Sequence, residues 1–265
     1  MSRVRQPFLA ATLLAALVAG GCATARFGRS VLPPGVGGPP PRIRGDHALV
    51  IDAERVRLTK DYLAIHNPPL RAVLPEADRA ESIGFEPRLV VVHYTAIPTL
   101  AGTLEAFAGL HIGTDREIIR RNGLLNVGIQ FVVDRDGAIY RLYPETVIAR
   151  HVIGLNHVAI GIENVGDGDL PARWFPGSRR PEAPLTRAQL AANLALVRYL
   201  AARYPSIGWV IGHSEYRWLE RPAHPAHELF YEALPGYRTE KRDPGRRFLK
   251  RLRRGLRQVA EGGVG

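Results

Sequence analysis

The chain has 265 residues, a length that allows one large domain or two small ones with an ample core. Hydrophobic residues make up 46% and charged residues 23%, which is typical of globular proteins and argues against a disordered or fibrous chain. The net charge of +11 favours an anionic partner such as nucleic acid, lipid head groups or an acidic polymer. The single cysteine excludes an internal disulfide and a cysteine-based metal cluster.

The N-terminus has the pattern of an export signal. A short basic start precedes an apolar run from Phe8 to Val18, too short to span a bilayer as a mature helix. Small residues then lead to Cys22, as in bacterial lipoprotein signals, although Ala19 stands where such signals usually carry Leu. We expect residues 1–21 to be a lipoprotein signal peptide and Cys22 to be lipidated. An ordinary cleaved signal peptide with an incidental cysteine is the alternative.

The sequence also indicates where the anchor and the folded domain lie. Ala23 after the cysteine is no Asp-type signal for retention in the inner membrane, so we expect an outer-membrane anchor facing the periplasm. Residues 22–45 are rich in Pro, Gly and Arg, which predicts a partly extended tether without a core of its own. The folded domain is then expected over residues 46–258, with its core motifs in residues 88–252.

Short apolar segments and longer segments of helical spacing alternate along the rest of the chain, which predicts an α/β fold. The turn Asp134-Arg-Asp-Gly137 joins two apolar runs into a predicted hairpin. Thr186 and Gln189 have the spacing of a capping box at the start of a helix. Strands are expected near residues 88–96, 128–133, 138–143, 158–164 and 207–211, and helices near 59–66, 99–109 and 186–204 and after Asp243.

Two histidines stand at the carboxyl ends of predicted strands, where open α/β sheets commonly place their chemistry: His93 and His213. In the strand 158–164, the alternation puts Glu163 on the same face as Gly161 and Ala159, and these small residues would leave room for a ligand. Histidine nitrogens with a carboxylate form a typical catalytic zinc site that keeps one position open. The pattern therefore indicates a metal site at the ends of these strands.

Five segments recur in the order found in one known family. They are Val92-His-Tyr-Thr-Ala96, the hairpin, Ala159-Ile-Gly-Ile-Glu163, Ile211-Gly-His213 and Lys241-Arg-Asp-Pro-Gly245. Over residues 88–252 the chain resembles the zinc-dependent N-acetylmuramoyl-L-alanine amidases of the type-2 amidase and peptidoglycan recognition protein superfamily. The resemblance implies a single domain with a central mixed β-sheet flanked by helices.

The resemblance also implies roles for individual residues, carried over by position. The metal ligands would be His93, His213 and Asp243, holding Zn²⁺. Glu163 would be the catalytic base and Lys241 would stabilise the oxyanion. Substrate-binding residues would be Tyr94, His151 and Asn156. The implied activity is cleavage of the amide between N-acetylmuramic acid and L-alanine in peptidoglycan, for cell-wall degradation or recycling, with peptidoglycan or muropeptides as the substrate. The expected lipid anchor makes a membrane a second partner, and the export signal argues against nucleic acid as a partner of the basic last helix.

The chain departs from the family pattern at two places, and one further role of Asp243 is open. Many relatives carry an aromatic–His pair in the hairpin strand, where this chain has Ile129-Gln130. The long segment between His213 and Asp243 contains His224 and His227, either of which is an alternative third ligand. Asp243 before Pro244 would also suit a helix N-cap.

Other histidines are expected on the surface or in loops: His111, His157, His224 and His227. A non-catalytic peptidoglycan-binding module of the same fold is the alternative function. Loss of a metal ligand or of Glu163 would point to that module, and the sequence retains both.

Overall fold

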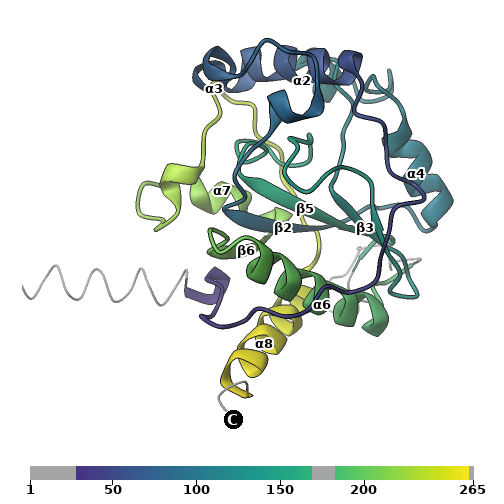
Figure 1. Cartoon of the computed structure of the whole chain (residues 1–265), viewed down its shortest axis with the longest axis vertical. Helices are drawn as coiled ribbons and strands as arrows, with labels where there is room; N and C mark the ends of the chain where they lie inside the picture. Colours follow the sequence, from purple (N-terminus) through teal and green to yellow (C-terminus); the bar gives the residue numbers. More distant parts are fainter. Residues whose placement is uncertain (1–27, 169–182, 263–265) are drawn as a thin grey trace, which may run out of the picture.

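A computed structural model describes residues 28–168 and 183–262 of the chain. Its centre is a six-stranded sheet in the order β1-β4-β3-β5-β2-β6 (Figure 1). Only β3 and β4 pair antiparallel, so the sheet is mixed, as the sequence predicted. The strands are β1 Ile43–Arg44, β2 Leu89–Tyr94, β3 Phe131–Val133, β4 Ile139–Arg141, β5 Ala159–Asn164 and β6 Trp209–Gly212.

Strand β2 lies between β5 and β6, and its side chains alternate between two apolar layers as the sequence predicted. Leu89 and Val91 pack in one cluster with Ile211, whereas Val90 and Val92 pack in a cluster on the other face. A strand buried on both faces reads as a continuous apolar run, and this explains the sequence Leu-Val-Val-Val.

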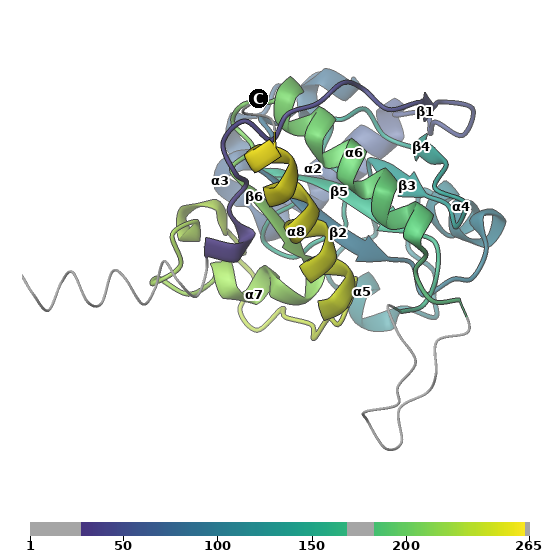
Figure 2. The same ribbon diagram turned by 90° about the horizontal axis from the view of Figure 1, so that it is seen from below.

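Helices cover both faces of the sheet. In Figure 1, α6 and α8 lie below the sheet and α2 lies above it; Figure 2 shows α6 and α8 side by side in front of the strands. Leu196 of α6 and Leu252 of α8 belong to the same cluster as Val90, which joins these helices to the sheet. The helices are α2 Ala53–His66, α3 Pro68–Val73, α4 Leu100–Ala108, α5 Glu117–Arg121, α6 Arg187–Arg203, α7 Tyr216–Leu219 and α8 Arg246–Gly262, with single 3-10 turns η1 Gly28–Ser30, η2 Ala80–Ile83, η3 His213–Glu215 and η4 His227–Leu229.

The start of one helix differs from the prediction, and the N-cap suggested for another is absent. Helix α2 begins at Ala53, six residues before the expected start, because the Asp52 side chain caps it by accepting from the Arg55 N–H. Its buried side includes polar residues such as Lys60, so apolar spacing could not reveal its first turns. Helix α8 begins at Arg246, so Asp243 is not its N-cap. The capping box at the start of α6 is confirmed.

The predicted tether is wrong for the part of it that the structure describes. Leu32 and Val36 are 8% and 3% exposed and belong to the core cluster under α6 and α8. The Leu32 N–H donates to the Gly208 carbonyl at 2.9 Å, and β1 pairs parallel to β4. The folded domain therefore includes residues 28–45. The expected boundary at residue 46 failed because two isolated apolar residues among prolines and glycines give no periodic signal.

The expected signal peptide and Cys22 lie outside the described residues, as does the segment 169–182. Among the residues that are described, no helix has both the length and the apolar composition needed to cross a membrane.

The packing of Leu32 gives a stability test. Leu32→Ala should lower the free energy of unfolding by roughly 2–3 kcal/mol, because it removes buried methyl groups and leaves a cavity. Val50→Ala is the control: Val50 is 76% exposed, and its truncation should change stability by no more than about 0.5 kcal/mol. Urea unfolding measures both. If neither substitution changed the free energy of unfolding, residues 28–45 would be a tether, as the sequence predicted.

Candidate metal centre and cleft

Two parallel strands and a following loop bring His93, His213 and Asp243 together. His93 is the last residue but one of β2, and His213 follows β6 directly. Val92 is paired with Gly212, so both histidines emerge at the same edge of the sheet. Gly212 also lets the third residue approach, since a side chain there would meet Pro244 at 2.8 Å, and the Ser214 N–H donates to the Asp243 carbonyl at 2.9 Å.

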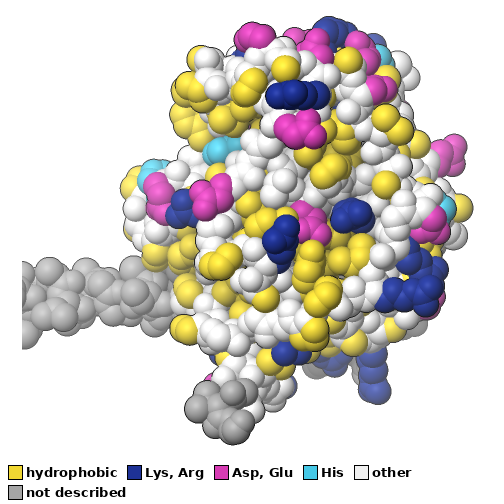
Figure 3. All heavy atoms as spheres, in the orientation of Figure 1, with side chains coloured by type: hydrophobic (Ala, Val, Ile, Leu, Met, Phe, Trp, Pro, Cys, Tyr) yellow, Lys and Arg dark blue, Asp and Glu magenta, His cyan; other side chains and the backbone are white. Residues whose placement is uncertain are grey.

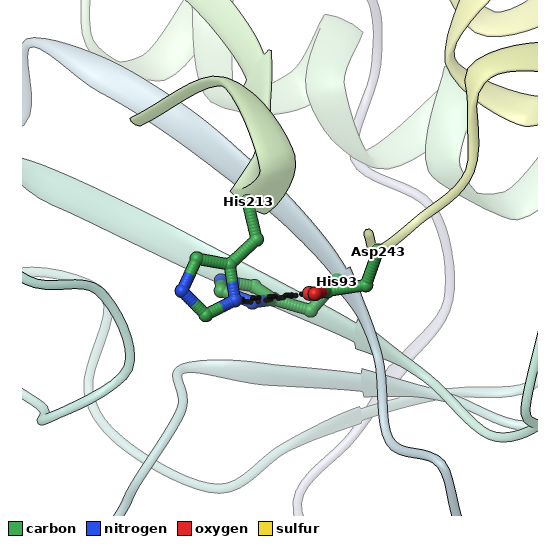
Figure 4. Close-up of side chains that lie close together, drawn as sticks. All are labelled: His93, His213 and Asp243. Carbon is green, nitrogen blue, oxygen red and sulfur yellow. Dashed lines mark hydrogen bonds and ion pairs between the residues drawn. The ribbon is translucent and has the colours of Figure 1, made fainter. Parts of the chain in front are cut away.

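The three side chains converge on one point (Figure 4). Nδ1 of His93 lies 2.9 Å from Nδ1 of His213, and the two nitrogens lie 3.1 and 3.0 Å from Oδ2 of Asp243. Tetrahedral ligands at zinc distances stand roughly 3.3 Å apart, close to this spacing. Two ring nitrogens facing each other at 2.9 Å cannot both carry a proton, and a shared cation removes that conflict. These residues therefore fit a metal ion.

The electrostatics of the cluster also suit a cation. Burial, and then the neighbouring His93, lower the pKa of His213 to about 4, so this ring stays neutral. Burial opposes ionisation of Asp243, but His213 and His93 hold the pKa of this carboxyl below its usual value. Neutral imidazole and ionised carboxylate are the forms that bind metals.

His93 is held in the required orientation by His151. Nε2 of His93 lies 3.1 Å from Nδ1 of His151, whose own Nε2 lies 3.3 Å from the Ala159 carbonyl oxygen. That carbonyl can only accept, so His151 carries its proton on Nε2 and accepts from the His93 Nε2–H at Nδ1. Nδ1 of His93 is then free to bind a metal. Outer partners of this kind typically change metal affinity ~10–100-fold.

Asn156 supports the loop that carries His151. Its side-chain oxygen accepts from the backbone N–H groups of His151 and Val152 at 2.9 and 2.8 Å, and its amide donates to the Tyr62 hydroxyl. The structure places Asn156 beneath the loop, 4% exposed, and not on the cleft wall where a substrate-binding residue would lie.

The small residues of β5 serve a different purpose from the one expected. A side chain at Gly161 would meet Ile129 at 2.1 Å and His151 at 2.9 Å, so protein fills this space and a ligand cannot. Gln130 accepts from the Gly161 N–H at 2.8 Å and donates to the Val147 carbonyl at 2.9 Å. The Ile129-Gln130 departure thus provides packing and backbone hydrogen bonds beside the cluster.

The cluster opens into a cleft of about 710 Å³. Of the residues expected at the site, Tyr94, His151, Glu163 and Lys241 line it with the three clustered residues. Another part of the wall, which the sequence did not predict, consists of α5 and the residues before it, including Arg116. These residues mix charged side chains with Ile118 and Ile119 in a helix of only five residues, so no periodic pattern marks them and only their place in the fold identifies them.

Glu163 is paired in register with His93 on the neighbouring strand. Its Oε2 is buried and has no hydrogen-bond partner among the described residues. Burial, and then the charge of Asp243, raise the pKa of this carboxyl well above its usual value, while Lys241 and Arg116 oppose the shift. A buried carboxylate oxygen without a partner, next to a cleft, is available to a ligand or to a water molecule.

The two alternative ligands lie elsewhere. Nδ1 of His224 accepts from the Ala226 N–H at 3.1 Å, and Nδ1 of His227 donates to the Leu219 carbonyl at 2.9 Å. Both hold the long segment between His213 and Asp243 in place. His224 lies in a loop, as expected, but is buried there.

The remaining two histidines differ in their surroundings. His157 lies in the turn before β5, as expected of a loop residue, and is half-buried there; burial lowers its pKa to about 4. His111 is exposed, as expected.

The geometry predicts which substitutions remove the metal. His93→Ala, His213→Ala and Asp243→Ala should each lose the bound ion, because two protein ligands rarely suffice. The matched controls His224→Ala and His227→Ala should retain it. Elemental analysis after dialysis measures metal content without reference to activity. If Asp243→Ala kept its metal ion and His224→Ala lost it, the third ligand would be His224 and not Asp243.

Comparisons with known proteins identify the family of the chain. Residues 84–246 match the family model described as N-acetylmuramoyl-L-alanine amidase. The endolysins of Klebsiella phage KP32 and Escherichia phage T7 are each 30% identical over 89 residues, 34% of this chain. The match spans 54% of either relative, about half its length.

One solved structure shows the same kind of similarity. It is an endolysin N-acetylmuramoyl-L-alanine amidase from Clostridium intestinale, 27% identical, covering 55% of this chain and 82% of its own, with a TM-score of 0.34. The family model is the stronger finding, since residues 84–246 are more than half of the chain. The chain therefore belongs to the N-acetylmuramoyl-L-alanine amidase family.

Proposed function

We propose that the protein is a zinc hydrolase that cleaves the amide bond between N-acetylmuramic acid and L-alanine in peptidoglycan. The observation that carries this proposal is the convergence of His93, His213 and Asp243 within 3.1 Å of one another. Glu163 and Lys241 line the same cleft. Membership of the amidase family supports the choice of bond.

Zinc is the metal that this donor set fits best. Two imidazole nitrogens and one carboxylate oxygen leave one of four tetrahedral positions open, as in catalytic zinc sites. Bound zinc would supply Lewis acidity toward a carbonyl oxygen and would lower the pKa of water. His151 keeps His93 in the tautomer that can bind it.

Glu163 is proposed as the general base. Its partnerless Oε2 can accept a hydrogen bond from the attacking water and then take the proton. A raised pKa makes the carboxylate a stronger base, and Lys241 and Arg116 help to keep it ionised. The proton can later pass to the leaving nitrogen.

Lys241 is proposed to stabilise the negative charge that develops on the carbonyl oxygen. Its ammonium group is a compact charge on a flexible chain, so it can approach a developing oxyanion closely. Arg116 lies on the same cleft wall, where it can pair with the carboxylates of the peptide stem. Tyr94 and His151 would contact the rest of the substrate.

The proposed location is the periplasmic face of the outer membrane, with Cys22 as the lipidated residue and cell-wall degradation or recycling as the role. The lipoprotein-like sequence before Cys22 supports this proposal. Labelling with a radioactive fatty acid should mark the wild-type chain and should be absent from Cys22→Ser.

Mass spectrometry of digested peptidoglycan tests the activity. The wild type should release intact stem peptides with a free L-alanine amino group, and a chelator should stop the release. Glu163→Gln keeps the size of the side chain but removes the base, so kcat should fall by ~10²–10⁴-fold. Zinc content should be unchanged in this variant. Tight binding of peptidoglycan without any cleavage would instead support a binding module.

Two substitutions separate the possible roles of Lys241. If it acts by charge alone, Lys241→Arg should keep much of the activity, whereas Lys241→Ala should lose ~10²–10³-fold, as for a removed oxyanion donor. If Lys241 also donates a proton, Lys241→Arg should lose nearly as much activity as Lys241→Ala, because a guanidinium group stays protonated. Zinc should remain bound in both. Wild-type turnover in Lys241→Ala would show that Lys241 is an ordinary surface charge.

A further inference from the structure

Helix α8 carries a continuous basic face. Its inner side is apolar and packs against the sheet and α6 through residues such as Phe248, Leu252 and Leu256. Its first acidic residue is Glu261, almost at the end of the helix. The exposed basic residues of α8 are Arg246, Arg247, Lys250, Arg251, Arg254 and Arg257, which we call the basic face.

This arrangement works against the helix itself. Lys250 stands four residues from both Arg246 and Arg254, and like charges at that spacing repel one another across one turn. The first turn contains basic residues and no acidic ones, which is the unfavourable sign for the positive end of a helix dipole. The basic face therefore does not stabilise α8, and its charge calls for another explanation.

Helix α2 shows the ordinary pattern in the same protein. Glu54 is in its first turn, and Arg57 pairs with Glu54 at 2.6 Å and with Asp61 at 3.2 Å. Figure 3 shows acidic side chains mixed with Lys and Arg over α2 and α3, at the top of the molecule. Helix α8 lies at the opposite end (Figure 1). Among the described residues, acidic side chains thus accompany the positive charges of the α2 and α3 end, whereas α8 itself carries six exposed basic residues and no acidic residue before Glu261.

We propose that the basic face of α8 binds an anionic phospholipid surface. The helix is about 25 Å long and presents its charges on a straight, convex surface, which can lie on a flat layer of head groups. The exposed residues are charged and not apolar, so the contact is electrostatic and does not require insertion. No residue of α8 lines the cleft, so this contact would leave the cleft accessible.

The start of the described chain lies against the same helix. The Arg253 guanidinium donates to the Ser30 hydroxyl at 2.7 Å, and Val31 forms a bridge with Trp209 of β6. Figure 2 shows η1 close to α8. Cys22 precedes Ser30 by eight residues, a span of at most about 28 Å.

The proposed lipid anchor and α8 can therefore reach one membrane together, and a lipid chain combined with a polybasic surface holds more firmly than either alone. The basic face adds to the proposed anchor, and its own test does not depend on lipidation.

Sedimentation of the full chain with lipid vesicles tests the proposal. The protein is mixed with vesicles of phosphatidylcholine alone and with vesicles that also contain phosphatidylglycerol. Any contribution of the apolar N-terminus appears with both, whereas the basic face should add binding only to the anionic vesicles. Each basic residue near such a surface contributes about 1 kcal/mol, roughly fivefold. The triple variant Lys250→Gln, Arg254→Gln, Arg257→Gln should therefore bind anionic vesicles roughly 100-fold more weakly at low salt.

A control variant removes the same charge elsewhere. Arg57→Gln, Arg71→Gln, Arg79→Gln changes residues of the α2 and α3 end and should bind anionic vesicles like the wild type. The thermal midpoint of the α8 variant should not fall, because like-charge repulsion is relieved. Equal binding to both vesicle types, or wild-type binding by the α8 variant, would overturn the proposal. The proposal would also be overturned if the wild type bound random double-stranded DNA tightly but did not bind anionic vesicles.

Discussion

The site depends on the parallel pairing of β2 with its two neighbours. Pairing with β6 puts His93 beside His213, and pairing with β5 puts His93 opposite Glu163. A shift of one residue in either pair would turn one of these side chains to the other face of the sheet. The apolar residues of β2 are buried on both faces, so such a shift would also disrupt the packing of both core layers. The packing of the core therefore fixes the positions of His93, His213 and Glu163 relative to one another.

A second constraint acts from the other side of the cleft. Arg150 is buried and donates to the carbonyls of Gly123 and Leu125 at 2.9 and 2.7 Å, while its guanidinium lies over the Tyr62 ring. Nε2 of His66 donates to the Asn122 carbonyl at 2.7 Å, and its Nδ1 lies 2.9 Å from the Glu232 carboxylate. These contacts join α2 to the loops around the cleft. The cleft wall is thus supported by polar groups, in contrast to the apolar support of the strands.

This contrast explains which parts of the fold and of the site could be predicted from the sequence. The strands, the hairpin and the α6 cap follow from local patterns, and the proximity of His93 and His213 follows from the rule that parallel strands end at one edge. The place of Asp243 relied on a family resemblance, because a loop residue has no periodicity. The wall formed by α5, the burial of His224 and the packing of Leu32 depend on contacts between distant segments. Such contacts leave no signal in any single stretch of sequence.

The N-terminal segment has a consequence for the edges of the sheet. In the strand order, β1 and β6 are the two outermost strands. The same segment supplies β1 at one edge and, through Val31, a bridge to Trp209 at the other. Unpaired strand edges invite pairing between separate molecules. A fragment that begins at residue 46 would leave β4 and β6 open to such pairing, so a recombinant form intended to remain monomeric should retain the chain from residue 28.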